Sequence, residues 1–327
     1  MSETNTSAGF VAIIGAPNAG KSTLVNALVG TKVSIVTQKV QTTRFPVRGI
    51  ALAGSAQMVL VDTPGIFKPR RRLDRAMVRS AWGGAEDADC VVLLVDAAAQ
   101  LAVKYPTAPG NEAAGQASPK ATAADHKAVE DVEMIIEGLK TSGTKAILVL
   151  NKIDLMKRDN LLAVADELYK TGVFDDVLMI SAEKGSGVDD LKALLAKRMP
   201  AGPWLYPEDQ AADAPVRILA AEITREKLFL RVHEELPYAA AVVTTEFKDM
   251  PDGSARIEQS IFVERDGQRA IVLGKGGQTL KWIGQKSREE LATLLDRPVH
   301  LFLHVKVEEK WSDDRALYTQ FGLEYDS

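Results

Sequence analysis

The chain has 327 residues, of which 46% are hydrophobic and 26% charged, with a formal net charge of −4. This length is about twice that of an average domain, so we expect two domains. The ordinary composition excludes a wholly disordered chain, and the slightly negative charge excludes a protein that is basic all over. Any site for nucleic acid must therefore be local.

The first residues, MSETNTSAGF, contain no basic segment followed by an apolar one, and no apolar run approaches the length of a membrane span. We expect a cytoplasmic protein, while peripheral membrane association stays open. The single cysteine, Cys90, lies in the apolar run DCVVLLVDA, which favours a buried structural thiol over a nucleophile.

Short apolar runs bounded by turn residues alternate with amphipathic segments over residues 8–200. Runs that are apolar on both faces are typical of buried strands in a mostly parallel sheet. The strand candidates are GFVAIIG, VRGIALAG, QMVLVDTPG, CVVLLVDA, KAILVLNK and VLMISAEKG, and two clear helix candidates are DHKAVEDVEMIIEGLK and NLLAVADELYK. This alternation predicts a doubly wound α/β domain.

Residues 97–124 fit neither pattern. They contain 11 Ala and 3 Pro without periodicity, which predicts a mobile, low-complexity insertion with no regular structure. A plain surface loop and an additional contact surface are both compatible with this composition.

The second half differs from the first. Residues 201–215, rich in Pro and Ala, are predicted to be a linker, and residues 216–327 a small α+β domain. Its expected elements are a helix (EKLFLRVHEELPYAA), two strands (AAVVTTEFKD and SARIEQSIFVE), a glycine-lysine loop, a helix (QTLKWIGQKSREELATLL) and a last strand (VHLFLHVKVEE). His300 and His304 lie about 13 Å apart along that strand, too far to share one metal ion.

A phosphate-binding loop is predicted between the first strand and the first helix. GAPNAGKS matches G-x-x-x-x-G-K-S, in which backbone amides and the helix N-terminus hold an anion, the lysine reaches the terminal phosphates and the serine hydroxyl binds Mg²⁺. A simple glycine-rich turn is the alternative. The predicted phosphate-binding residues are Gly15, Ala16, Pro17, Asn18, Ala19, Gly20, Lys21, Ser22 and Thr23.

Three further motifs follow at the ends of later strands. DTPG (Asp62, Thr63, Pro64, Gly65) offers a carboxylate for Mg²⁺ and an amide for a γ-phosphate. NKID supplies Asn151, Lys152 and Asp154, and a carboxylate at Asp154 can accept two hydrogen bonds from guanine that adenine cannot donate. SAEK (Ser181, Ala182, Glu183) lies where its backbone meets the base. This order of motifs predicts a guanine nucleotide site.

These motifs resemble those of Ras-like GTPases, in the form found in bacterial translation-associated GTPases. The resemblance places a switch threonine in QTTR, where we favour Thr43 and leave Thr42 open, and implies a Mg²⁺ site formed by Ser22, Thr43 and Asp62. Ile66 stands where Ras-like proteins have a water-orienting glutamine. Asn18 resembles an asparagine that binds K⁺ in related GTPases, although a loop asparagine bonded to its own backbone is the alternative.

The second glycine-lysine loop, Gly274-Lys275-Gly276-Gly277, fits the G-x-x-G loop with which KH domains hold single-stranded RNA. Residues 265–288 contain six basic side chains and one acid, a local charge of +5. Trp282 is a candidate for base stacking or for the core. The predicted RNA-binding residues are Gly274, Lys275, Gly276, Gly277, Lys281 and Lys286.

Together, the two domains resemble the Era family of GTPases. The resemblance implies a Ras-like P-loop GTPase domain followed by a type II KH domain, GTP hydrolysis that requires Mg²⁺, and binding to the 3′ end of 16S rRNA during assembly of the 30S ribosomal subunit. Stimulation by K⁺ is a further hypothesis. A signalling GTPase whose second domain docks a protein is the main alternative, and a nucleotide kinase a weaker one. The arginine-rich stretch RRRLDRAMVR after DTPG is either an rRNA contact or a solvated face.

Overall fold

A computed structural model describes residues 6–37, 42–44, 46–105, 121–156, 158–213, 215–232, 240–315, 318 and 323–325. The chain divides into two compact units. Unit 1 comprises Met1–Ser34, Thr43–Asp213 and Gly322–Ser327, and unit 2 comprises Ile35–Thr42 and Ala214–Phe321.

Unit 1 is built on a sheet with the strand order β6-β5-β4-β1-β3-β2-β7. Its strands are β1 (Ser7–Ile14), β2 (Val47–Ala53), β3 (Ala56–Asp62), β4 (Cys90–Asp96), β5 (Ala146–Asn151), β6 (Phe174–Met179) and β7 (Ala212–Asp213). Neighbours from β6 to β3 pair in parallel, whereas β2 is antiparallel to both β3 and β7. The parallel order brings the carboxyl ends of β1, β3, β4 and β5 to one edge, as the motif order predicted.

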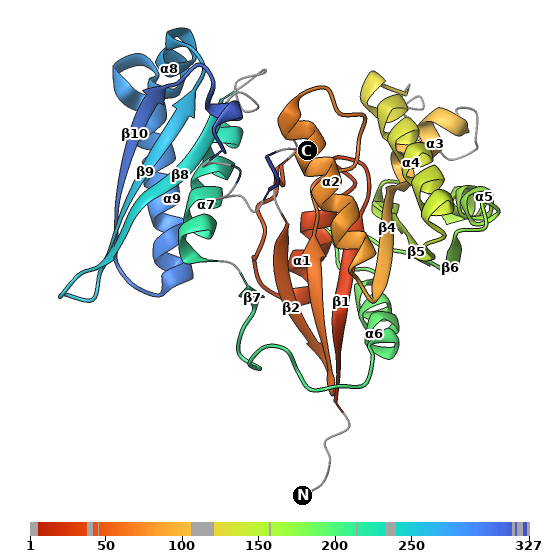
Figure 1. Ribbon diagram of the computed structural model, residues 1–327. Coiled ribbons are helices and arrows are strands. Elements are labelled where there is room, and N and C mark those ends of the chain that lie inside the picture. The colour runs from red at the N-terminus through yellow and green to blue at the C-terminus, as the bar shows by residue number, and fades with distance from the viewer. Residues whose placement is uncertain are drawn as a thin grey trace, which may run out of the picture. The chain divides into compact units, whose positions relative to one another are not determined.

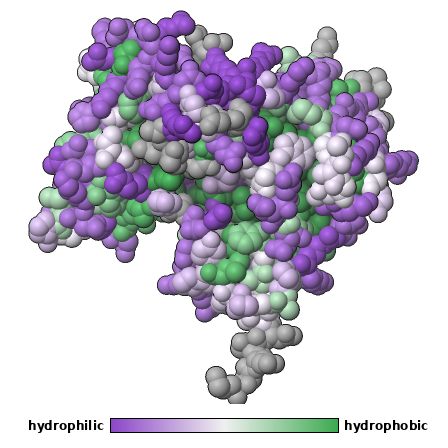
Figure 2. All heavy atoms as spheres, viewed as in Figure 1, coloured by the Kyte–Doolittle hydropathy of each residue, from purple (hydrophilic) through white to green (hydrophobic). Residues whose placement is uncertain are grey.

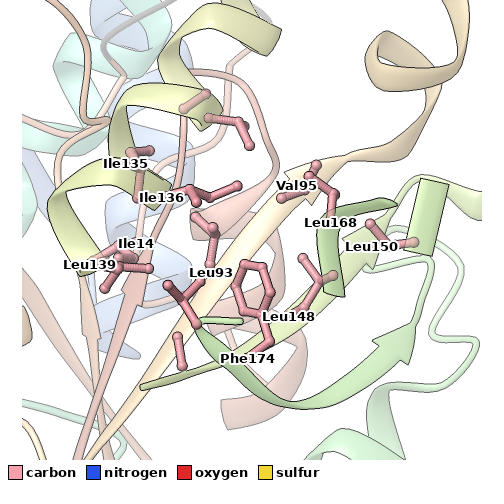
Figure 3. Close-up of a cluster of buried hydrophobic side chains, with 14 of the residues drawn as sticks. Ile14, Leu93, Val95, Ile135, Ile136, Leu139, Leu148, Leu150, Leu168 and Phe174 are labelled. Atoms are coloured by element: carbon pink, nitrogen blue, oxygen red, sulfur yellow. The ribbon is translucent and has the colours of Figure 1, made fainter. Parts of the chain in front are cut away.

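Helices cover both faces of this sheet (Figure 1). They are α1 (Lys21–Val29), α2 (Arg72–Glu86), α3 (Ala97–Lys104), α4 (Ala123–Ser142), α5 (Arg158–Tyr169) and α6 (Val188–Arg198). One apolar cluster joins the sheet to α2, α3, α4 and α5, and a second joins it to α1 and α6. In the first cluster, Ile135, Ile136 and Leu139 of α4 point toward strand residues such as Leu93 (Figure 3).

The prediction that residues 97–124 lack regular structure is wrong at both ends. Residues 97–104 form α3, and α4 begins at Ala123. The Asp96 carboxylate accepts hydrogen bonds from the Ala98 and Ala99 amides and so caps α3, and Leu101 is buried in the core. Alanine is the best helix former, so a cap and one buried leucine suffice here. Residues 106–120 lie outside the described residues.

Unit 2 contains a sheet with the strand order β10-β9-β8, in which β8 and β9 are antiparallel and β9 and β10 parallel. Its elements are α7 (Val216–Arg231), β8 (Ala240–Asp249), β9 (Ala255–Val263), α8 (Asp266–Leu273), η3 (Lys275–Gly277), α9 (Gln278–Leu295), β10 (Val299–Val307) and η4 (Trp311–Asp313). The predicted strands and α9 are present. The first helix begins ahead of the predicted segment, at Val216 instead of Glu226, and α8 was not anticipated.

On the face that Figure 2 shows, hydrophilic residues cover most of the surface of each unit, and hydrophobic residues form separate patches among them. Within the described residues, no helix combines the length and apolar character that a membrane span needs. Cys90 is buried, and this burial raises the pKa of its thiol. A neutral, inaccessible thiol agrees with the structural role that its apolar surroundings predicted.

Candidate functional site

The predicted phosphate loop connects β1 to α1. Gly15 and Gly20 have φ angles of 155° and 99°, and a Cβ at Gly20 would lie 2.4 Å from Nδ2 of Asn151. Only glycine fits at Gly20, because the backbone is left-handed and another side chain occupies the space. The loop therefore presents its amides at the N-terminus of α1, where an anion is favoured.

Lys21 extends along the inside of this loop. Its Nζ donates hydrogen bonds to the carbonyl oxygens of Gly15 (3.0 Å) and Ala16 (2.8 Å), and the side chain is only 6% exposed. Burial lowers the pKa of Lys21 to about 8, while the nearby carboxylate of Asp62 opposes this shift. A buried cation held next to anion-binding amides favours phosphate ligands.

Ser22, Thr43 and Asp62 form a cluster of oxygen atoms. Ser22 Oγ donates to Asp62 Oδ2 (2.7 Å), Thr43 Oγ1 donates to the same atom (3.3 Å), and the two hydroxyls lie 2.9 Å apart. Burial raises the pKa of Asp62, and its bond from Ser22 opposes that rise. Asp62 Oδ1 is buried without a hydrogen-bond partner among the described residues. One carboxylate with two hydroxyls is a donor set that suits Mg²⁺ bound together with substrate phosphates.

Thr42 bonds a different set of residues. It groups with unit 2, where its hydroxyl bonds that of Thr37 (2.7 Å) and its carbonyl accepts a hydrogen bond from Arg225. Of the two threonines left open by the sequence, Thr43 is the one next to Ser22 and Asp62.

The DTPG segment is fastened to the phosphate loop. Thr63 Oγ1 donates to the carbonyl of Ile13 (2.8 Å), and the Ile66 amide donates to the carbonyl of Gly15 (3.1 Å). A Cβ at Gly65 would lie 2.9 Å from the backbone nitrogen of Pro17. The Gly65 backbone therefore approaches the phosphate loop as closely as a glycine allows, which suits an amide that meets a γ-phosphate.

Asn151 joins the phosphate loop to the SAEK segment. Its Nδ2 donates to the carbonyl of Ala19 (2.8 Å), and its Oδ1 accepts from the amide of Ala182 (2.9 Å). Asn151 is 2% exposed, so its side chain holds two loops together. Ser181 is also buried and accepts from the Lys184 amide (3.2 Å).

Asp154 remains exposed, in a short 3₁₀ turn that spans Ile153–Leu155. Lys152 precedes this turn with a φ of 66°, and its Nζ forms an ion pair with Asp96 Oδ2 (2.5 Å). Asp96, which both caps α3 and holds Lys152, was not among the predicted residues. The signal was available, since an aspartate directly before three alanines is typical of a helix N-cap.

The second glycine-lysine loop lies between α8 and α9. Gly274, Gly276 and Gly277 have φ angles of 72°, 60° and 76°, and a Cβ at Gly274 would lie 2.3 Å from Oγ1 of Thr279. Lys275 and Lys281 are exposed, which suits contact with a solvated phosphate backbone.

Two side chains near this loop are more constrained than the sequence suggested. Lys286 forms an ion pair with Glu289 (2.8 Å), which reduces its share of the local positive charge. Trp282 packs against the core of unit 2, and the Arg231 guanidinium lies 5.5 Å from its ring centroid. Of the two roles considered for Trp282, this packing favours the core.

Comparison with known proteins agrees with this geometry. A family model described as 50S ribosome-binding GTPase matches residues 10–152, and one described as KH domain matches residues 235–312. GTPase Era of Caulobacter vibrioides is 64% identical over 99% of this chain and 98% of its own length. The chain belongs to the GTPase Era family. GTPase Era of Maricaulis maris is 57% identical over the full length of both chains.

Solved structures of Era extend the comparison. Era in complex with MgGDPNP and nucleotides 1506–1542 of 16S ribosomal RNA superposes with a TM-score of 0.83 at 37% identity, covering 97% of this chain and 99% of that one. A tyrosine-to-alanine variant of Aquifex aeolicus Era bound to GDP·AlF₄⁻ gives the same TM-score and coverage at 36% identity. Membership in the Era family confirms the predicted fold class, a Ras-like GTPase domain followed by a KH domain, and the predicted GTPase activity.

Proposed function

We propose that this protein is a GTP-hydrolysing switch that binds the 3′ end of 16S rRNA and acts in assembly of the 30S ribosomal subunit. The observation that carries the GTPase part of the proposal is the cluster of Ser22, Thr43 and Asp62 beside the buried cation of Lys21. Such a cluster is sensitive to the γ-phosphate, which orders switch segments in GTPases until hydrolysis releases them.

In this proposal, the phosphate-loop amides and Lys21 hold the phosphates, while Ser22, Thr43 and Asp62 hold Mg²⁺ and the Gly65 amide meets the γ-phosphate. The buried, unpartnered Oδ1 of Asp62 supports a cation at this place. Mg²⁺ would neutralise charge that develops on the phosphates during hydrolysis. Lys21 stays protonated near neutral pH, since its pKa of about 8 is that of the nucleotide-free site and phosphates raise it.

Asp154 selects guanine in this proposal. Its exposed carboxylate can accept hydrogen bonds from guanine N1–H and N2–H₂, while Asn151 fixes the surrounding loops and the Ser181–Glu183 backbone meets the base edge.

For RNA binding, we propose the loop Gly274–Gly277 with Lys275 and Lys281, and a smaller part for Lys286. The left-handed glycines and the two exposed lysines support it. The solved Era that contains nucleotides 1506–1542 of 16S rRNA covers nearly the whole of this chain. We further propose that unit 1 is the GTPase domain and unit 2 the RNA-binding domain, in a cytoplasmic protein. The predicted linker, residues 201–215, is not a free connection, because β7 (Ala212–Asp213) pairs with β2 in the sheet of unit 1.

Asn18 is the proposed K⁺ contact. It is exposed in the phosphate loop, in a left-handed conformation with a φ of 62°. Hydrolysis should then be faster in K⁺ than in Na⁺ buffers of equal ionic strength, and the difference should disappear in Asn18→Ala. Equal rates of the unchanged protein in the two salts would refute this role.

The whole proposal is tested by RNA binding in two nucleotide states. The protein is loaded with GDP or a non-hydrolysable GTP analogue and titrated with RNA carrying the 3′ end of 16S rRNA or its scrambled sequence. We expect tighter binding of the native sequence in the analogue state. The double variant Lys275→Asp/Gly276→Asp should lose RNA binding and keep GTP hydrolysis. Equal binding of the scrambled RNA, or binding in neither state, would contradict the proposal.

A further inference from the structure

The last described residues of the chain, 323–325, belong to unit 1 and contact helix α2. Glu324 Oε2 lies 3.7 Å from Arg79 Nη1, and Arg72 Cζ lies 4.6 Å from the centroid of the Tyr325 ring. Leu323 is only 6% exposed. Glu324 and Arg79 also line the same groove of about 540 Å³ in unit 1. We call residues 323–325 the tail.

The arginines that the tail contacts belong to a row along α2. Arg72, Arg75 and Arg79 are three and four residues apart, so they lie on one side of the helix over about 10 Å. All three are exposed. Asp74 accepts hydrogen bonds from the two backbone amides that precede the helix, and within the described residues it forms no ion pair with these arginines. We call the three arginines the arginine stripe.

The tail presents to this stripe the two kinds of group that a nucleotide contains, an anion and a flat ring. Arginine binds phosphate oxygens as it binds carboxylate oxygens, and its guanidinium plane stacks on bases as it stacks on aromatic side chains. Glu324 thus resembles a phosphate and Tyr325 a base. An ion pair between side chains that are 61% and 79% exposed contributes little free energy, so a strand with several phosphates can displace the tail.

We propose that the arginine stripe is a second RNA-binding surface, and that the tail covers it until RNA takes its place. The proposal rests on the binding of rRNA proposed above and adds a phosphate contact outside the loop Gly274–Gly277. RNA fits better than an acidic protein surface, because every nucleotide offers both the anion and the ring. Of the two roles that the sequence left open for the arginine-rich stretch after DTPG, the tail contacts favour the rRNA contact.

The test measures the stripe in the absence of RNA binding at the second glycine-lysine loop. All variants carry Lys275→Asp/Gly276→Asp and are titrated with a labelled oligo-uridine of twelve nucleotides at several salt concentrations. One variant lacks residues 323–327. A second, Glu324→Gln/Tyr325→Ala, keeps the buried Leu323 and so tests the tail contacts without loss of that side chain.

Two further variants are controls. Arg72→Ala/Arg79→Ala, added to the truncated protein, removes the two arginines that the tail contacts. Glu308→Gln/Glu309→Gln removes two negative charges from exposed positions of unit 2. It therefore matches the loss of the two acids that the truncation removes.

We expect the truncated protein to bind oligo-uridine about tenfold more tightly. The slope of log affinity against log salt should steepen by about 1.4, which corresponds to two phosphate contacts of about 0.7 each. Glu324→Gln/Tyr325→Ala should bind about threefold more tightly. Adding Arg72→Ala/Arg79→Ala should remove the gain, and Glu308→Gln/Glu309→Gln should leave the affinity unchanged.

Other outcomes would overturn the proposal. Unchanged affinity in both tail variants would show that the tail covers no RNA site. If the gain survived Arg72→Ala/Arg79→Ala, or if Glu308→Gln/Glu309→Gln produced the same gain, a general loss of negative charge would explain it. Failure of the proposed function would look different, because the protein with an intact loop Gly274–Gly277 would then not bind the 3′ end of 16S rRNA in either nucleotide state.

Discussion

The two glycine-lysine loops of this protein share a composition and differ in almost every physical property. In the first, Lys21 is 6% exposed and bonds two backbone carbonyls, and a Cβ at Gly20 would meet Asn151. In the second, Lys275 is exposed, and a Cβ at Gly276 would have open space around it. One loop is packed into a domain, and the other lies on a surface.

This difference matches the ligands. A nucleoside triphosphate is compact and enters a prebuilt cradle, where few desolvated contacts each contribute strongly. A single-stranded RNA is long and solvated, so its phosphates meet exposed cations whose contributions are individually small and sensitive to salt. Four experiments test this difference between the two loops.

Exchanging each lysine for alanine should give the largest contrast. Lys21→Ala should weaken Mg·GTP binding at least about a hundredfold, because it removes a desolvated, charge-assisted contact to the phosphates. Lys275→Ala should leave GTP affinity within twofold. Calorimetric titration measures both. If the Lys21→Ala protein bound GTP nearly as well as the unchanged protein, the buried Lys21 side chain would not contribute to the free energy of GTP binding.

The glycines offer a second contrast. Gly20→Ala should lower GTP affinity about twentyfold and reduce the melting temperature, because the new Cβ meets Asn151 at a φ of 99°. Gly276→Ala meets no neighbour and carries only the cost of a left-handed alanine, about 1 kcal/mol. Melting curves and nucleotide titrations compare them. Equal losses of melting temperature in the two variants would mean that both loops are equally packed.

Salt should distinguish the two ligands. Lys275→Ala and Lys281→Ala should each weaken RNA binding a few-fold, and each should reduce the slope of log affinity against log salt by about 0.7, the value for one phosphate contact to a single strand. Fluorescence anisotropy with RNA carrying the 3′ end of 16S rRNA gives the slopes. Lys286→Ala serves as a comparison, because its pairing with Glu289 predicts a smaller change. If the slope of log affinity against log salt were the same in all three variants as in the unchanged protein, the RNA would not contact these lysines.

The smallest effect concerns pH. Burial lowers the pKa of Lys21 to about 8 in the nucleotide-free protein, so folding disfavours its charged form. This cost is complete below pH 8 and disappears as pH rises toward the ordinary lysine value of 10.5. Lys21→Met should therefore melt a few degrees higher than the unchanged protein at pH 7, and the gap should narrow between pH 8 and 10. A difference in melting temperature that stays constant over this range would argue against the lowered pKa of Lys21. Lys275→Met is the control, and its melting temperature should not change relative to the unchanged protein over the same range.

The sequence was informative where the signals are local. The phosphate loop, DTPG and NKID each follow a buried strand. Each motif and its strand lie within about a dozen residues, so a short stretch of sequence contains the whole signal. The structure brings them to one sheet edge, as expected, because parallel strands leave little choice. Strand β10 was equally clear, since apolar residues alternate along its whole length, and helix α9 was indicated by apolar residues near both of its ends.

The elements and contacts that were not predicted share physical causes. Helix α3 was not predicted, because its sequence is rich in alanine and because Asp96, its N-cap, was assigned only to the end of strand β4. The first residue of α7 was predicted too late in the chain, because Pro215 precedes the helix and the residues before it have the composition of a linker. The hydrogen bonds of Asn151 with Ala19 and of Thr43 with Asp62 join residues far apart in sequence. No periodicity or spacing reports such pairs, which exist only once the sheet has formed.

The way in which the sheet of unit 1 ends on either side also matters for solubility. On one side, β7 pairs with β2 at Arg48 and Gly49, and the Ile50 amide continues that pairing with the carbonyl of Ala211. On the other side, β6 is short and carries Asp175 and Asp176, which pair with Arg198. Covered or charged edges do not recruit strands from other molecules. Both edges therefore oppose strand pairing between molecules through this highly apolar sheet.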